Sequence, residues 1–175
     1  MSDHKDWEGS FREWLQSNEM YLDFKVSNAG FDSTLIDWYR DVFVENGAMP
    51  GARLTEIMLS TRRRIFPLAF EIVQGDIALT LGHGLRMALE EGPSEIPGAA
   101  NSIFLLGNIL LSLTEEEAVV EMAEIVQGEM MDILYQVWPC CREHNAAVYA
   151  ELRAGAPVWW CRTGAHVLKR IGGGS

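Results

Sequence analysis

Apolar residues recur at helical spacings along most of this chain, and that periodicity is the strongest constraint on its fold. Trp7, Phe11 and Trp14 are spaced by four and three residues, which predicts a short helix at the start. The further helices expected from the same pattern span about residues 33–46, 53–65, 68–91, 99–113, 114–138 and 140–154. Because strands do not alternate with these helices, the sequence predicts an all-α fold, a single compact bundle of about six or seven helices.

Short motifs mark the expected helix ends. Thr114-Glu115-Glu116-Glu117 is typical of a capping box, in which the threonine hydroxyl accepts a hydrogen bond from a first-turn amide. Asp32 or Ser33 is expected to cap the helix that ends at Asn46-Gly47, where glycine favours the left-handed conformation. Pro67 predicts either a kink or the start of a new helix.

One segment of the expected helices is repeated. The residues from Glu71 to Asp76 recur almost unchanged from Glu124 to Glu129, and both a duplicated helical hairpin and a coincidence remain open. Each copy places a glycine, Gly75 or Gly128, in mid-helix, which costs about 1 kcal/mol relative to alanine. We expect close helix crossings at both glycines.

A strand is expected near each end of the chain. Apolar and polar residues alternate from Met20 to Ser27, the period of a half-buried strand. The segment from Val158 to Cys161 is the expected partner. The bundle is therefore predicted to carry a small two-stranded β patch that joins the termini.

The chain length fits one domain. A chain of 175 residues, 48% of them hydrophobic, can bury a core without disulfides. We expect residues 1–171 to form a single helical domain, and residues 172–175, Gly-Gly-Gly-Ser, resemble a linker or tag remnant.

The net charge of −11 restricts the partners. It repels nucleic-acid phosphates and favours association with a basic protein surface, so we expect a protein partner and no direct nucleic-acid binding. The apolar stretch from Ile103 to Leu113 is too short to span a membrane, and the polar start lacks a secretory signal. The sequence therefore predicts a cytoplasmic protein without membrane association, and leaves a homodimer open.

Acidic residues gather on one face of the expected helix that begins at Thr114. Glu117, Glu121, Glu124 and Asp132 fall within one narrow sector at 100° per residue, and apolar residues fill the opposite sector. The predicted partner-binding residues are Glu115, Glu116, Glu117, Glu121, Glu124, Asp132, Trp159 and Trp160. The six carboxylates of this set are called the acidic stripe below, and a merely solvated face is its alternative.

A second interpretation gives the same helix a metal. Glu121-x-x-Glu124 and Glu129-x-x-Asp132 are carboxylate pairs of the kind that hold Mg²⁺ in all-helical nucleotide hydrolases. A matched second set on a facing helix is missing from the sequence, so this metal-dependent enzyme is an alternative rather than the main hypothesis.

Cysteine and histidine residues gather near the end of the chain. Cys140, His144, Cys161 and His166 can be arranged as a loose Cys₂His₂ zinc site, with Cys140 and His144 one helical turn apart. This pattern predicts a zinc-stabilised helical domain as a further alternative. Buried core cysteines and redox chemistry are the other interpretations.

The sequence contains no recognisable catalytic motif of the nucleophile, zinc-protease, phosphate-loop or kinase types. We therefore expect a non-enzymatic acidic helical binding protein. Such a protein would act as an inhibitor or adaptor that docks on a basic, nucleic-acid-binding protein, as a phage anti-defence or immunity-type protein does.

Overall fold

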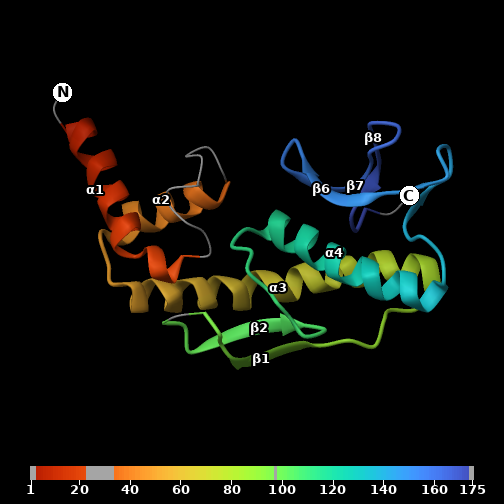
Figure 1. Cartoon of the computed structure of the whole chain (residues 1–175), viewed down its shortest axis with the longest axis horizontal. Helices are drawn as coiled ribbons and strands as arrows, with labels where there is room; N and C mark the ends of the chain where they lie inside the picture. The colour runs from red at the N-terminus through yellow and green to blue at the C-terminus, as the bar shows by residue number, and fades with distance from the viewer. Residues whose placement is uncertain (1–2, 23–33, 97, 174–175) are drawn as a thin grey trace. The chain divides into compact units, whose positions relative to one another are not determined.

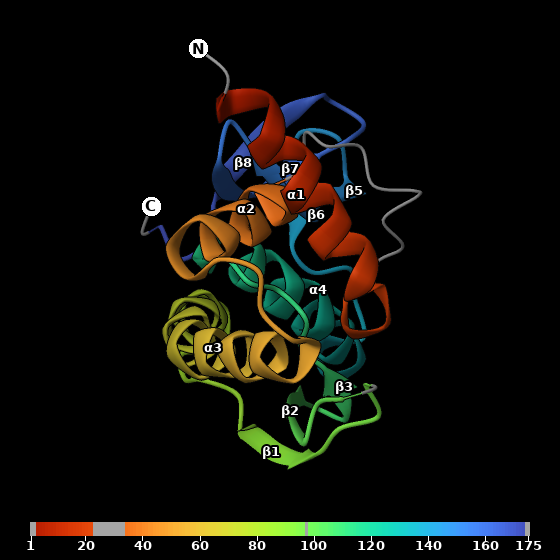
Figure 2. The same ribbon diagram turned by 90° about the vertical axis from the view of Figure 1, so that its left-hand side faces the viewer.

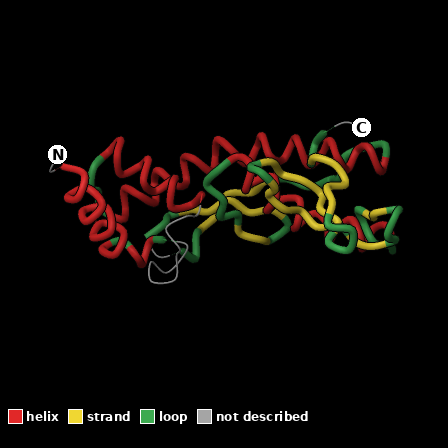
Figure 3. The backbone as a smooth tube through the Cα atoms, turned by 90° about the horizontal axis from the view of Figure 1, so that it is seen from above, coloured by secondary structure: helices red, strands yellow, loops and turns green. Residues whose placement is uncertain are grey.

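The computed structural model describes residues 3–22, 34–96 and 98–173. Within these ranges the chain forms four α-helices, one short 3₁₀ helix and eight strands in three antiparallel sheets (Figure 1). The prediction of an all-α bundle of six or seven helices is therefore wrong. Figure 3, which colours strands separately from helices, shows how much of the chain the strands occupy.

The described residues divide into two compact units. The N-terminal unit contains the residues up to 61 together with 91–102, and the C-terminal unit contains 62–90 together with the residues from 103 onward. Helix α3 (Gly51–Leu81) contributes residues to both units. That residues 1–171 form a single domain therefore stays a prediction.

The N-terminal unit begins with two of the expected helices. α1 (Asp3–Ser17) and α2 (Thr34–Asn46) are confirmed, and the short η1 helix (Glu19–Tyr21) follows α1. The rings of Phe11 and Trp14 lie 5.5 and 5.2 Å from that of Phe43, so aromatic contacts join α1 to α2. Gly47 ends α2 with a φ of 72°, as expected, whereas the predicted caps Asp32 and Ser33 lie outside the described residues.

α3 runs through Pro67 without interruption, so the two helices predicted on either side of this proline are one. Proline in a helix interior costs about 3 kcal/mol or more. Ile65 and Phe66 before it and Ala69 after it are all buried, and the burial of such a face offsets that cost. The helix ends before Gly82, whose φ is 78°, rather than near Glu91.

The apolar segment predicted as a helix over residues 99–113 forms strands instead. β2 (Asn101–Leu105) and β3 (Asn108–Ile109) pair as an antiparallel hairpin, and β1 (Leu89–Pro93) lies on the other side of β2. The two turn residues, Leu106 and Gly107, have φ values of 51° and 77°, as the tight two-residue hairpin requires. The turn chemistry around Gly107 therefore overrides the apolar content that favoured a helix.

α4 (Glu115–Leu134) begins where the capping box predicts. The Thr114 hydroxyl accepts a hydrogen bond from the Glu117 amide at 3.3 Å. The buried face of this helix is the predicted apolar sector, with Ala118, Val119, Met122, Ala123, Val126 and Met130 below the surface. The helix ends at Tyr135, in the left-handed conformation, and not at Trp138.

Beyond Pro139 the chain forms strands, so the helix predicted over residues 140–154 is wrong. β4 (Cys140–Cys141) pairs with β5 (Ala146–Ala147), and a three-stranded sheet of β6 (Tyr149–Arg153), β7 (Ala156–Cys161) and β8 (His166–Arg170) follows. In this sheet β7 lies between β6 and β8, and α4 contacts β6 and β7 (Figure 2). β-Branched and aromatic residues such as Val158 and Trp159 favour this conformation.

The β patch predicted between the two ends of the chain is not formed by the described residues. Val158–Cys161 is a strand, as predicted, but its neighbours on both sides are β6 and β8. Met20 and Tyr21 belong to the 3₁₀ helix η1, and residues 23–27 of the expected partner strand lie outside the described residues.

A buried carboxylate joins α3 to the three-stranded sheet inside the C-terminal unit. Asp76 is fully buried, and its Oδ2 accepts a hydrogen bond from Trp159 Nε1 at 2.7 Å. Its Oδ1 accepts from Lys169 Nζ at 3.0 Å and from the Gly172 amide at 3.1 Å. These charge-assisted hydrogen bonds hold β7, β8 and the segment after β8 to one point on the helix.

The repeated segment has a shared structural role. In the first copy the Gln74 side chain bonds both the amide and the carbonyl of Leu85, and in the second Gln127 Nε2 donates to the carbonyl of Trp138. Both partners lie eleven residues after the glutamine. Each copy therefore ties the segment that leaves its helix back onto that helix, which favours the duplication.

No helix in the described ranges is both long enough and apolar enough to cross a membrane.

The two mid-helix glycines do not mark close helix crossings, because a Cβ added at Gly75 or Gly128 would meet no atom within 4 Å. We therefore expect Gly128→Ala to stabilise the protein by about 1 kcal/mol through helix propensity alone, which raises Tm by roughly 2–4 °C for a chain of this size. Thermal unfolding followed by circular dichroism measures the shift.

Gly107→Ala is the matched control, since its Cβ would also enter open space but its φ is 77°. This substitution should lower Tm, because alanine is strained in the left-handed region. A decrease in Tm for Gly128→Ala would contradict the interpretation.

Candidate metal centre

Two tight hairpins each present one cysteine and one histidine. In the first, Cys141 is the last residue of β4 and His144 lies in the turn before β5. In the second, Cys161 ends β7 and His166 begins β8, and these two residues are direct partners in the strand register. Asn145 and Ala165 adopt left-handed φ values of 47° and 48° beside the two histidines, which closes both turns tightly.

The four side chains of the two hairpins converge. One donor atom from each of Cys141, His144, Cys161 and His166, called the Cys/His cluster below, lies within 4.8 Å of the other three. The sulfur of Cys141 is 3.4 Å from His144 Nδ1 and 3.3 Å from His166 Nε2, and the sulfur of Cys161 is 3.7 Å from His144 Nδ1. Tetrahedral zinc with its usual bond lengths places sulfur and nitrogen ligands about 3.6 Å apart. The spacing in the cluster therefore suits this ion.

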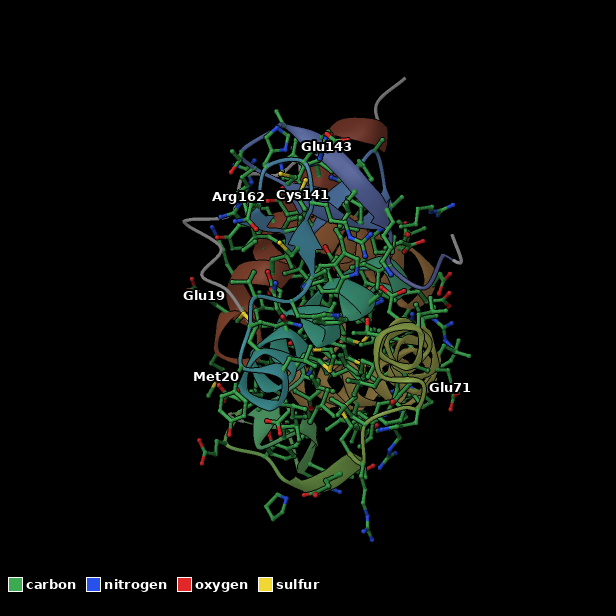
Figure 4. The ribbon with its side chains drawn as sticks, turned by 90° about the vertical axis from the view of Figure 1, so that its right-hand side faces the viewer. Glu19, Met20, Glu71, Cys141, Glu143 and Arg162 are labelled. Carbon is green, nitrogen blue, oxygen red and sulfur yellow. The ribbon has the colours of Figure 1, made fainter. Side chains whose placement is uncertain are left out.

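The cluster contains three of the four predicted ligands, and its fourth member is Cys141 rather than Cys140. The prediction placed Cys140 and His144 on one face of a helix, but the segment is a strand, where successive side chains point to opposite faces. Cys140 is half-buried, and its thiol donates to the carbonyl of Cys141 at 3.7 Å. Figure 4 labels Cys141 together with Glu143, which lies in the same hairpin.

The electrostatics of the cluster favour the thiolate that a metal requires. The pKa of Cys141 is lowered to about 6, chiefly by the hydrogen bond with His144; burial opposes this shift, and hydrogen bonds with His166 and Cys161 contribute to it. The amide of Gly164 donates to the sulfur of Cys161 at 3.4 Å. Thiolates and neutral imidazoles are the forms that bind zinc.

The cluster is closed on the sulfur side and open on the histidine side. Cys141 and Cys161 are fully buried, whereas His144 is exposed and the His166 side chain is 33% exposed. Structural zinc sites use four protein ligands, whereas catalytic sites use three and keep the fourth position for water or substrate. The four donors of the cluster therefore suit an ion that is held structurally and cross-links the two hairpins.

Much of the acidic stripe has partners within the C-terminal unit. Glu115 forms an ion pair with Arg64 at 2.8 Å, and the Glu121 carboxylate accepts hydrogen bonds from the amides of Leu111 and Ser112 at 2.8 and 2.9 Å. Glu117 accepts from the Thr114 hydroxyl at 3.0 Å. Glu115, Glu116, Glu124 and Asp132 are the exposed members.

Within the acidic stripe, Glu124 is the residue whose carboxyl pKa is shifted. Partial burial raises the pKa of this carboxyl group, and the neighbouring charge of Glu121 raises it further, whereas Arg162 opposes the shift. A cation placed beside Glu124 would therefore be favoured.

The proposed magnesium ligands do not form a group. Among the described residues, one group of three or more potential metal ligands lies close together, and it is the Cys/His cluster. No such group is formed by Glu121, Glu124, Glu129 and Asp132. The Glu121 carboxylate instead accepts hydrogen bonds from two backbone amides. The geometry gives the nucleotide-hydrolase alternative no site.

The two adjacent tryptophans have different environments. Trp159 is fully buried, donates to Asp76 and packs edge-on against Trp138 at 5.4 Å, so it belongs to the core. Trp160 is half-buried, and the guanidinium of Arg153 lies 4.2 Å from its ring centroid. Of the pair, Trp160 is the one whose ring reaches the surface.

The sequence reasoning missed two residues that shape the cluster. Gly164 lies under the ring of His144, and Glu143 places a carboxylate oxygen 3.7 Å from His166 Nδ1. In the sequence, Glu143 directly precedes the predicted ligand His144, and Gly164 lies two residues before the predicted ligand His166. A glycine between Cys161 and His166 indicates a tight turn. Without the hairpin conformation, neither could be assigned to the site.

Gly164 should be essential for the position of His144. A Cβ at this residue would lie 2.2 Å from His144 Cε1 and 2.7 Å from Nδ1, so Gly164→Ala must displace the ring. We expect the variant to bind Zn²⁺ about tenfold more weakly, the size of effect that changes around ligands produce. Competition with a chromogenic chelator measures the affinity, with Gly128→Ala as the control in open space. Equal affinities of the two variants would argue against the assigned ligand position.

Comparisons of the chain with protein-family models, with curated proteins and with solved structures return no match, so the chemistry of the cluster itself must carry the functional argument.

Proposed function

We propose that this chain is a non-enzymatic zinc-binding protein in which Cys141, His144, Cys161 and His166 hold one structural zinc ion. The observation that carries the proposal is the convergence of the four donor atoms within 4.8 Å, from two separate hairpins. Two thiolates and two imidazoles in a tetrahedral arrangement are the ligand set that zinc prefers in structural sites. These four residues lie on two β-hairpins and not, as expected from the sequence, in a helical domain.

The metal has a clear structural task in this fold. The β4–β5 hairpin consists of two residue pairs, Cys140 with Ala147 and Cys141 with Ala146, which is far less pairing than an isolated hairpin needs for stability. A zinc ion shared with the β7–β8 hairpin would fix the short hairpin to the larger sheet. Such binding energy acts directly as folding energy.

The adjacent cysteines provide a matched test of this proposal. The purified chain should contain one zinc ion per molecule, Cys141→Ser should lose it, and Cys140→Ser should retain it, because the Cys140 sulfur lies outside the cluster. Elemental analysis after gel filtration gives the stoichiometry, and the unfolding temperature with and without a chelator gives the stability.

Zinc-free wild-type protein that also fails to take up added Zn²⁺ would overturn the proposed function. Loss of zinc from Cys140→Ser but not from Cys141→Ser would instead reinstate the ligand set predicted from the sequence.

The same chemistry suggests a compartment. All three cysteines are free thiols, and thiol ligands persist where the surroundings are reducing. We propose that the protein works in the cytoplasm.

As a second candidate, we propose that the acidic stripe docks a basic protein partner, as an inhibitor or adaptor would. What supports it is the exposure of Glu116, Glu124 and Asp132 on α4, where burial and the neighbouring charge of Glu121 raise the pKa of Glu124. A basic side chain of a partner would relieve that repulsion and speed association through electrostatic steering.

A charge reversal at Glu124 tests whether the stripe binds locally or only through net charge. Glu124→Lys should slow association with a labelled oligoarginine peptide more than Glu45→Lys, which makes the same charge change on an exposed residue of α2. Stopped-flow fluorescence at two salt concentrations measures both rates. Identical rates for the two variants would mean that only the overall charge of −11 acts, and the docking surface would be withdrawn.

A further inference from the structure

The two histidines of the Cys/His cluster present different ring nitrogens to it. His144 directs Nδ1 toward both sulfurs, at 3.4 Å from Cys141 and 3.7 Å from Cys161. His166 directs Nε2 toward Cys141, at 3.3 Å. The ring planes are 68° apart with centroids at 5.2 Å, so the two rings approach the centre from different directions.

The backbone around each histidine accounts for this difference. His144 lies in the short turn only three residues after Cys141, and its ring covers the Cα of Gly164 in the opposite hairpin. Nδ1 is the nearer nitrogen to the backbone, so a histidine this close to its partner cysteine reaches the centre with Nδ1. His166 instead starts a strand and faces Cys161 in register, and its more distant nitrogen reaches across to Cys141.

The nitrogen of His166 that faces away from the cluster has a carboxylate beside it. Glu143 Oε2 lies 3.7 Å from His166 Nδ1, although Glu143 belongs to the other hairpin. Its side chain is 75% exposed and can move closer without disturbing a packed core. A histidine that binds a metal usually donates its other ring N–H to such a carboxylate, which fixes the ring orientation and makes the ligating nitrogen more basic.

We infer that zinc is bound through Nδ1 of His144 and Nε2 of His166, and that Glu143 is a positioning residue that accepts a hydrogen bond from the Nδ1–H group of His166. This inference rests on the proposed zinc site and specifies its ligand atoms. Glu143 thereby couples the β4–β5 hairpin to the β7–β8 hairpin a second time, outside the metal itself.

The ligand atoms can be read directly by NMR of the whole chain loaded with ¹¹³Cd²⁺ in place of Zn²⁺. Binding through Nε2 couples the metal to both carbon-bound ring protons of a histidine, whereas binding through Nδ1 couples it to Hε1 alone. We expect the first pattern for His166 and the second for His144. Long-range ¹H–¹⁵N spectra of the zinc form should place the remaining ring proton on Nδ1 of His166 and on Nε2 of His144.

The role of Glu143 is tested by Glu143→Gln, with Glu129→Gln as the control that removes an equal charge from an exposed site on α4. Glu143→Gln should weaken Zn²⁺ binding about tenfold, the lower end of the range for loss of such a partner. It should also shift the ¹⁵N resonances of His166 while leaving those of His144 in place. Glu129→Gln should change neither the affinity nor the resonances.

The outcomes separate this inference from the proposed function. Failure of wild-type protein to bind either metal would remove the zinc site itself. Binding with Nε2 coordination by both histidines would leave the zinc site and overturn the ligand assignment. Equal affinities and equal His166 spectra for the two glutamine variants would overturn the positioning role of Glu143.

Discussion

The contact on which the C-terminal unit depends is the one between the buried carboxylate of Asp76 and three donors, two of them from the sheet and one from the segment that follows it. A buried charge is tolerated only when hydrogen bonds and an opposite charge compensate it, and removal of one partner typically costs 3–5 kcal/mol. Trp159, Lys169 and Gly172 therefore have fixed positions relative to α3. Because Trp159 and Lys169 lie on β7 and β8, the same contact fixes the hairpin that carries Cys161 and His166.

Local signals in the sequence predicted the elements that depend on local chemistry. The capping box at Thr114, the glycine at the end of α2 and the aromatic spacing of α1 were correct, because each acts within one or two helical turns. The helix predictions for residues 99–113 and 140–154 were wrong because the apolar content of these segments fits a buried helix or a strand equally well. Left-handed turn residues such as Leu106 and Ala165 decide between the two, and no residue-type preference predicts this conformation for leucine or alanine.

The Cys/His cluster was predictable in kind but not in all its members. Clustering of cysteine and histidine near the end of the chain predicted that these side chains meet, and three of the four predicted residues belong to the cluster. The choice between the adjacent cysteines required the local backbone, since a helix and a strand direct consecutive side chains differently. Glu143 and Gly164 act only through the juxtaposition of two hairpins, and contacts of that kind are not encoded in spacing along the chain.

Cys141 and Cys161 are twenty residues apart in the sequence, and the proposed metal would join them across the two hairpins. A cross-link that closes a loop of this length removes conformations from the unfolded chain, and for a covalent bridge the effect is about 3 kcal/mol. The zinc ion would thus act on the unfolded ensemble as a disulfide does, and it could do so even under reducing conditions, which break a disulfide. Unlike a disulfide, such a bridge can be opened by a competing chelator, so the availability of the metal would set how much of the chain is folded.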